Sequence, residues 1–97
     1  MFSWDASKAI TNFEKHGISF EEAATVFADD EALDWEDQGH SDHERRFKRL
    51  GSSVMGRIIL LVYTLRKSDD QETIRIISAR QASRKERKAY SGSGDRF

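Results

Sequence analysis

The chain has 97 residues with no cysteine and no proline, so it has room for one domain with a small core. The missing cysteines exclude a disulfide framework and a thiolate metal site. The longest apolar run, Ile58–Tyr63, is too short to cross a bilayer, and the first residues contain no apolar signal segment. We expect a cytoplasmic domain over residues 1–91 that does not contact membranes, followed by a flexible tail over residues 92–97.

The net charge of −1 hides an uneven distribution along the chain. Residues 1–43 contain two lysines and eleven acidic residues, a net charge of −9. Residues 44–97 contain fourteen lysines and arginines and six acidic residues, a net charge of +8. This asymmetry indicates a polyanionic partner for the basic half. The alternative is that the two halves neutralise each other in the folded protein.

The N-terminal third predicts a short strand and two helices. Phe2–Trp4 alternates apolar and polar residues, which is typical of an edge strand. Asp5 is a good N-cap and Gly17 a good C-terminal cap for a first helix between them. Ser19 and Glu22 form an S-x-x-E capping box, which predicts a second helix through about residue 28.

The remaining chain predicts a sheet and one more helix. Strands are expected over residues 32–36, 44–50, 57–66 and 72–80. Ser83 and Glu86 form another capping box, opening a short helix through about Tyr90. The order β-α-α-β-β-β-β-α predicts an α+β fold in which the helices pack on one face of an antiparallel sheet.

Two arginines stand at strand ends and are candidates for binding a phosphate. Arg66 ends the 57–66 strand and Arg80 ends the 72–80 strand, so the hairpin is expected to bring them to one site. A guanidinium fork holds two oxygens while remaining charged, which suits a phosphoryl transition state. The alternative is a pair of cations at the rim of the fold.

The last helix begins with further cations, namely Arg84, Lys85, Arg87 and Lys88. The helix macrodipole disfavours cations in a first turn, so local helix stability does not explain them. A helix N-terminus together with arginines does suit a bound phosphate. The alternative is a solvated helix that balances the acidic N-terminal half.

Lys8, Asn12 and His16 share one flank of the first predicted helix, at i, i+4 and i+8. His16 could serve as a general acid or as a fixed cation. The alternative is that a histidine before a C-capping glycine only satisfies terminal carbonyls, and spacing alone favours that interpretation.

A metal site is a further candidate, at His40-x-x-His43 with Glu36, Asp37 and Asp42 nearby. Nothing in the pattern places these side chains on one face, so we expect no metal. The sequence also lacks a P-loop, a G-x-G-x-x-G run and a G-x-S-x-G elbow, so we expect no cofactor.

Beyond these patterns, the chain resembles the BrnT toxin family. The N-terminal matches are Trp4-Asp5, Lys8, Asn12, the run Lys15–Ala23 (KHGISFEEA) and Val26-Phe27. The later matches are Glu44-Arg45, Gly51, Val62-Tyr63-Thr64, Arg66, Ile74–Arg80, Ala82-Ser83-Arg84, Glu86-Arg87 and Tyr90. The KHGISFEEA and RIISAR blocks are the most specific of these matches.

The resemblance implies a RelE-like fold and a ribonuclease that arrests translation. It also implies a BrnA-type antitoxin with a ribbon-helix-helix DNA-binding part. The complex would repress its own operon, with operator DNA contacted only through the antitoxin. The free toxin is expected to be a monomer or a weak dimer.

The implied chemistry is metal-independent RNA cleavage, in which the 2′-OH attacks the adjacent phosphate. It needs a base, an acid and cations around the phosphate. We expect Arg66 and Arg80 to hold the phosphate, with Lys8 and His16 as cation and proton donor. The remaining expected contacts to RNA come from Arg75, Arg84, Lys85 and Arg87. The candidates for the acid–base residue are Tyr90 and Glu86, and water held by the substrate is the alternative base.

Two other classes of function fit the basic half of the chain. One is a nucleic-acid-binding module without catalysis, which would show steep salt dependence without cutting RNA. The other is a protein-interaction domain whose basic face meets an acidic partner.

Overall fold

The computed structural model describes residues 1–40 and 43–94. The elements in chain order are β1 (Phe2–Ser3), α1 (Ala6–His16), α2 (Phe20–Ala24), the 3₁₀ helix η1 (Thr25–Ala28), β2 (Leu33–Glu36), the 3₁₀ helix η2 (Gln38–His40), β3 (Arg46–Ser52), β4 (Ile58–Ser68), β5 (Gln71–Gln81) and α3 (Arg84–Gly94). This order confirms the expected α+β class and the expected sequence of elements. No helix in these described ranges is long and apolar enough to cross a membrane.

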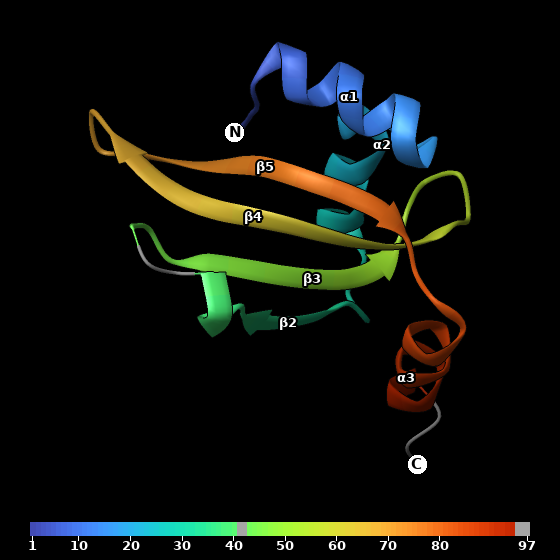
Figure 1. Ribbon diagram of the computed structural model, residues 1–97. Helices are drawn as coiled ribbons and strands as arrows, with labels where there is room; N and C mark the ends of the chain where they lie inside the picture. The colour runs from blue at the N-terminus through green and yellow to red at the C-terminus, as the bar shows by residue number, and fades with distance from the viewer. Residues whose placement is uncertain (41–42, 95–97) are drawn as a thin grey trace.

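One sheet of five strands forms the centre of the molecule, in the order β1-β5-β4-β3-β2 (Figure 1). All neighbouring strands are antiparallel except β1, which runs parallel to the first half of β5. Because β1 pairs only with Ile74 and Arg75, no strand among the described residues lies on the outer side of the second half of β5. Helix α1 lies along this edge (Figure 1).

The helix caps form largely as the sequence predicts. The Asp5 side chain accepts hydrogen bonds from the N–H groups of Ser7 and Lys8. Gly17 adopts a left-handed φ of 69° and donates its N–H to the Phe13 carbonyl. The predicted box at Ser19 forms only in part, because the Ser19 hydroxyl caps the Glu22 N–H while the Glu22 carboxylate bonds elsewhere.

The carboxylate of Glu22 turns into the protein instead of capping its own helix. It accepts hydrogen bonds from the Ser53 hydroxyl at 2.7 Å and from the Arg57 guanidinium. These bonds, the one from Arg57 first, hold the pKa of Glu22 below its ordinary value despite the opposing effect of burial. The glutamate of the S-x-x-E pattern therefore links α2 to the β3–β4 turn through hydrogen bonds.

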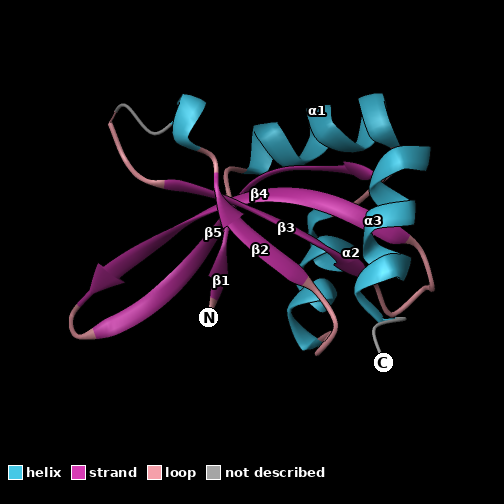
Figure 2. Ribbon diagram, turned by 90° about the horizontal axis from the view of Figure 1, so that it is seen from below, coloured by secondary structure: helices cyan, strands magenta, loops and turns pink. Residues whose placement is uncertain are grey.

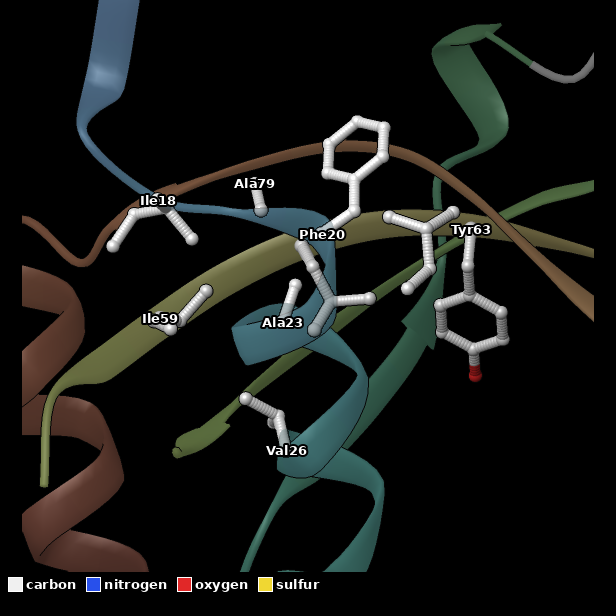
Figure 3. Close-up of a cluster of buried hydrophobic side chains, with 9 residues drawn as sticks. Ile18, Phe20, Ala23, Val26, Ile59, Tyr63 and Ala79 are labelled. Carbon is white, nitrogen blue, oxygen red and sulfur yellow. The ribbon is translucent and has the colours of Figure 1, made fainter. Parts of the chain in front are cut away.

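The main core lies between the sheet and the α1–α2 layer (Figure 3). Its buried members are Ile18, Phe20, Ala23, Val26, Ile59, Leu61, Tyr63, Ile76 and Ala79. Side chains alternate along a strand, so Ile59, Leu61 and Tyr63 of β4 face this layer while Leu60 faces the opposite side.

Helix α3 covers part of the opposite face, which corrects the expectation that all helices pack on one side. Leu50, Leu60 and Ala82 form a second buried cluster there, and Tyr90 of α3 packs against it. In Figure 2, α3 stands at one end of the sheet, so it covers only that end. The reason is that β4 is apolar on both faces, so each face needs some cover.

Helix α3 also extends four residues beyond its expected end near Tyr90, through Gly94. Serine and glycine are weak helix formers, and they fill this last stretch of the helix. The boundary expected at residue 92 therefore falls inside α3, and residues 95–97 of the expected tail lie outside the described residues.

The side chain of Asn12 joins α1 to the outer edge of β5. Its amide oxygen accepts the Ala79 N–H at 3.0 Å, and its amide nitrogen donates to the Ala79 carbonyl at 2.8 Å. The same nitrogen donates to the Ile18 carbonyl at 3.0 Å. The amide thus pairs with Ala79 as a neighbouring strand would, which matters because an unpaired buried backbone group is destabilising.

Replacing Asn12 by alanine should lower the free energy of unfolding by about 2–4 kcal/mol, because it leaves the Ala79 N–H and two carbonyls without partners. Urea unfolding followed by circular dichroism measures this change. Thr11→Ala is the matched control, since Thr11 is the exposed neighbour on the same helix. Equal stability of the two variants would contradict the role given to the amide.

Candidate functional site

The sheet face opposite α1 and α2 carries cations from three strands. We call this surface the open face, and its strand positions include Trp35, Arg46, Lys48, Val62, Thr64, Arg66, Arg75, Ser78 and Arg80. The register places these residues on one side because side chains alternate along each strand. Among the described strand residues, none of the positions on this face is Asp or Glu. The strands' acidic residues Asp34, Glu36 and Glu72 fall on the other face.

Two arginines flank one threonine in the middle of the open face. Arg46 of β3 pairs with Thr64 of β4, and Thr64 pairs with Arg75 of β5. We call these three residues the arginine row. Adjacent strands are about 4.8 Å apart, so the two arginine backbones lie roughly 10 Å apart and both side chains can reach one phosphate. The Thr64 hydroxyl is buried between them and has no hydrogen-bond partner in the described part of the chain.

A pocket of about 280 Å³ lies between α1 and β5, where β5 has no neighbouring strand. Lys8, Lys15 and His16 line it from the helix, and Ile77 and Ser78 line it from the strand. We call it the α1 pocket. The shared flank that spacing predicted for Lys8 and His16 therefore faces one cavity. Ser78 belongs to both the α1 pocket and the open face, so the two surfaces are continuous.

The expected convergence of Arg66 and Arg80 is wrong. In the β4–β5 ladder, Arg66 is opposite Thr73 and Arg80 is opposite Leu60. Thr73 and Arg80 are seven residues apart on β5, which corresponds to roughly 20 Å. The reason is the antiparallel arrangement, which places the end of one strand beside the start of the next.

Arg80 is held by a carboxylate of the same chain. Its guanidinium donates two hydrogen bonds to Glu86, at 2.7 and 2.9 Å. Glu86 also accepts the Ser83 N–H at 2.8 Å, and the Ser83 hydroxyl accepts the Glu86 N–H, so this capping box is complete. The bond from Arg80, before all other causes, lowers the pKa of Glu86 to about 2 although burial opposes it.

The two candidate acid–base residues are engaged in structural contacts. Tyr90 donates its hydroxyl to Asp29 at 2.7 Å, and this bond together with burial raises the pKa of Tyr90 to about 12. Burial raises the pKa of Asp29, but hydrogen bonds from the Ser52 N–H and from Tyr90 outweigh it and leave the pKa lowered. Neither Tyr90 nor Glu86 has a pKa suited to accepting a proton near neutral pH.

The remaining predicted RNA contacts lie toward the two ends of the open face. Arg66 pairs with Glu44 at 3.3 Å in an exposed contact, which contributes little stability. Arg84, Lys85 and Arg87 are exposed on α3, which stands at one end of the sheet (Figure 2) and is joined to Arg80 through Glu86. The Glu86 carboxylate already caps the N-terminus of that helix, which favours the solvated-helix interpretation of its first turn.

The described residues contain no group of three or more His, Cys, Asp or Glu side chains that could hold a metal ion. Of the residues considered for such a site, Asp42 and the His40 side chain lie outside what the structure describes.

Sequence reasoning missed Arg46 and Lys48, which contribute two cations to the open face. The strand that contains them is weakly patterned, and the cations are denser in the sequence after Arg75. The available signal was the i, i+2 spacing of Arg46 and Lys48, which puts both side chains on one face of any strand. Arg49 between them lies on the other face, where it donates to the carbonyls of Val26 and Asp29.

Comparison with protein families matches residues 4–86 to the family described as the ribonuclease toxin BrnT of type II toxin–antitoxin systems. The chain belongs to this family. This confirms the resemblance drawn from the KHGISFEEA and RIISAR blocks, and a type II system implies an antitoxin partner for this BrnT-family chain.

Solved structures include a similar fold in the crystal structure of the ribonuclease toxin BrnT of Brucella abortus. The two chains share 24% sequence identity with a TM-score of 0.65, over 87% of this chain and 99% of the Brucella chain. At this identity the likeness establishes a shared fold. A comparison with curated protein sequences finds no match.

The Arg80–Glu86 pair makes stability depend on acid pH. Glu86 titrates near 4.5 in the absence of its partners and at about 2 in the folded chain, so the pair stabilises the fold above about pH 4.5 and loses this effect as the pH falls toward 2. Glu86→Gln should therefore be less stable than wild type near neutral pH, and the difference should shrink on acidification. Urea unfolding at about pH 7 and about pH 3 measures it. Glu21→Gln, at an exposed position, is the control, and a difference for Glu86→Gln that stays constant with pH would contradict the assignment.

Proposed function

We propose that this chain is a metal-independent endoribonuclease that binds and cleaves RNA on the open face. The observation that carries the proposal is a sheet face with cations from three strands and no acidic strand position in the described chain. Membership of a family described as ribonuclease toxins supports it. A polyanion is the partner that such a surface attracts.

The arginine row holds the phosphate at which the RNA is cut. The Arg46 and Arg75 forks can bind the non-bridging oxygens from two sides and stabilise the charge that builds up in the transition state. Lys48, on the same face and strand as Arg46, adds a third positive charge. Arg46 takes the place first expected for Arg80, because the register sets Arg46 and Arg75 on either side of Thr64, whereas Arg80 lies opposite Leu60.

The α1 pocket supplies the proton. The 2′-OH of the RNA is the internal nucleophile, so the reaction needs no metal-bound water. His16 donates a proton to the 5′ oxygen that leaves, and Lys8 stabilises the negative charge nearby. The 2′-OH proton passes to water held by the substrate. Arg66 at one end of the open face and Arg84, Lys85 and Arg87 at the other contact the RNA backbone on either side.

The partner that controls this activity is an antitoxin of the BrnA type. An acidic or mixed segment of the antitoxin covers the open face and thereby blocks the arginine row. Its ribbon-helix-helix part binds operator DNA, and the complex represses its own operon. Free in the cytoplasm, the toxin cuts RNA and arrests translation.

Replacing Arg46 or Arg75 by glutamine should reduce RNA cleavage by about 100-fold, because each removes one arm that stabilises the transition state. Cleavage of total RNA in the presence of EDTA, followed by gel electrophoresis, measures the loss. Arg45→Gln is the matched control. Arg45 pairs with Glu36 at 2.9 Å and lies over the Phe47 ring, on the other face of the sheet.

Cleavage by wild type and by Arg45→Gln that survives EDTA, together with loss in the two row variants, would support the proposed site. Equal cleavage by all four proteins would contradict it. Binding of RNA without cleavage by wild type would instead support the non-catalytic binding module.

Replacing His16 by glutamine should lower the cleavage rate by about 100-fold or more while leaving RNA affinity nearly unchanged, because glutamine cannot donate the proton. Single-turnover cleavage measures the rate, and binding of a 2′-O-methyl RNA, which cannot be cut, measures the affinity. Glu14→Gln on the same helix is the control, since Glu14 lines a different hollow from the α1 pocket. An equal fall in affinity and rate would show that His16 only binds.

A further inference from the structure

One large aromatic side chain lies exposed on the open face. Trp35 of the edge strand β2 is 43% exposed, and it has no aromatic contact in the described part of the chain. Trp4, the other tryptophan, is half-buried and packs edge-on against Phe20 with ring centroids 5.9 Å apart. The fold therefore uses Trp4 in its core and leaves Trp35 at the surface.

The orientation of Trp35 is fixed by its two neighbours on β2. Asp34 accepts a hydrogen bond from the Tyr63 hydroxyl at 2.7 Å and pairs with Arg49. Glu36 pairs with Arg45. Both carboxylates are thus anchored on the α1–α2 side of the sheet, and alternation along the strand places the Trp35 side chain on the open face.

Trp35 begins a row that crosses the whole sheet. Trp35 is opposite Lys48, Lys48 is opposite Val62, and Val62 is opposite Ser78. We call these four residues the tryptophan row. It spans three strand spacings, about 14 Å, and ends at the α1 pocket, which Ser78 lines. The arginine row is its neighbour on the open face: Arg46 is two residues from Lys48 on β3, and Thr64 is two residues from Val62 on β4.

We propose that Trp35 stacks on a base of single-stranded RNA bound to the open face. An indole beside a lysine can bind one nucleotide: the ring stacks on the base and the ammonium group lies near the phosphate. Single-stranded RNA is favoured because an unpaired base offers a free face to an aromatic ring. The inference rests on the proposed function. It adds a site for a base at the β2 edge of the open face, whereas the α1 pocket lies at the β5 edge.

The surrounding charge favours RNA over a protein as the occupant. Lys48 is directly opposite Trp35, and Arg46 is its diagonal neighbour on the open face. Within the described residues no acidic side chain pairs with Lys48, so its charge is available to a polyanion. An apolar protein surface laid over Trp35 would have to desolvate this cation.

The test is the affinity of the full chain for a single-stranded 2′-O-methyl oligonucleotide. Trp35→Leu should bind about 10- to 100-fold more weakly, whereas Trp35→Phe keeps a ring and should retain most of the affinity. The slope of log affinity against log salt should be the same in both variants and wild type, because no charge is changed. Phe13→Leu is the matched control, an aromatic that is 55% exposed on α1 and lies on the other side of the sheet.

Fluorescence provides a readout that does not depend on a destabilising substitution. The chain has two tryptophans, so Trp4→Phe leaves Trp35 as the single source of tryptophan emission. Stacking on a base should quench this emission as the oligonucleotide saturates the protein, with a midpoint that matches the dissociation constant. The Trp4→Phe protein must keep wild-type cleavage, which confirms that it is folded.

The outcomes separate this inference from the proposed function. If Trp35→Leu binds like wild type, or if Trp35 emission does not change at saturation, stacking is wrong while RNA cleavage on the open face still stands. The exposed indole would then be assigned to a protein partner. If wild type neither binds the oligonucleotide nor cleaves RNA, both proposals are overturned.

Discussion

The pairing of the Asn12 amide with Ala79 is the contact on which the arrangement of the molecule depends. A sheet strand in the middle of a fold normally has a neighbour on each side, and in the described part of the chain the second half of β5 has none on its outer edge. One side chain replaces that neighbour by satisfying both backbone groups of Ala79. Its bond to the Ile18 carbonyl also fixes the chain where it leaves α1. The α1 pocket exists because a helix, and not a strand, lies at this edge.

The two faces of the sheet differ in how their charged residues are arranged. On the α1–α2 side, acidic residues of β2 are paired with Arg45, Arg49 and Tyr63, so the edge strand is tied down. On the open face, none of the described strand positions is acidic, although Arg66 pairs with Glu44 at one end and Arg80 with Glu86 at the other. The acidic and basic halves of the sequence therefore neutralise each other on one face and leave the other face positive. The mutual neutralisation expected of the two halves is thus seen on the α1–α2 side, while a polyanionic partner for the open face stays a prediction.

Local signals in the sequence predicted the elements well, because caps and strand patterns act over a few residues. Asp5, Gly17 and Ser83 mark helix ends in the structure where the sequence places them. The path of the Glu22 carboxylate could not be predicted, because its partners Ser53 and Arg57 are about thirty residues away along the chain. The same limit explains the error over Arg66 and Arg80, since strand register depends on the hairpin as a whole. Arg46 could not be assigned to a site for a different reason. Its strand has little alternation of apolar and polar residues, so the sequence does not show which side chains share a face.

The contact between Arg80 and Glu86 makes the electrostatic potential of the open face depend on a helix that is not part of the sheet. With α3 docked, Glu86 compensates the charge of Arg80, and Tyr90 closes over Leu50 and Leu60. If α3 moved away, Arg80 would lose its carboxylate partner, and the apolar surface of Leu50 and Leu60 would be exposed beside it. Docking of α3 and the charge of this end of the open face therefore change together, because the same helix carries Glu86. The potential that a polyanion meets at this end is a property of the tertiary structure as much as of the residues themselves.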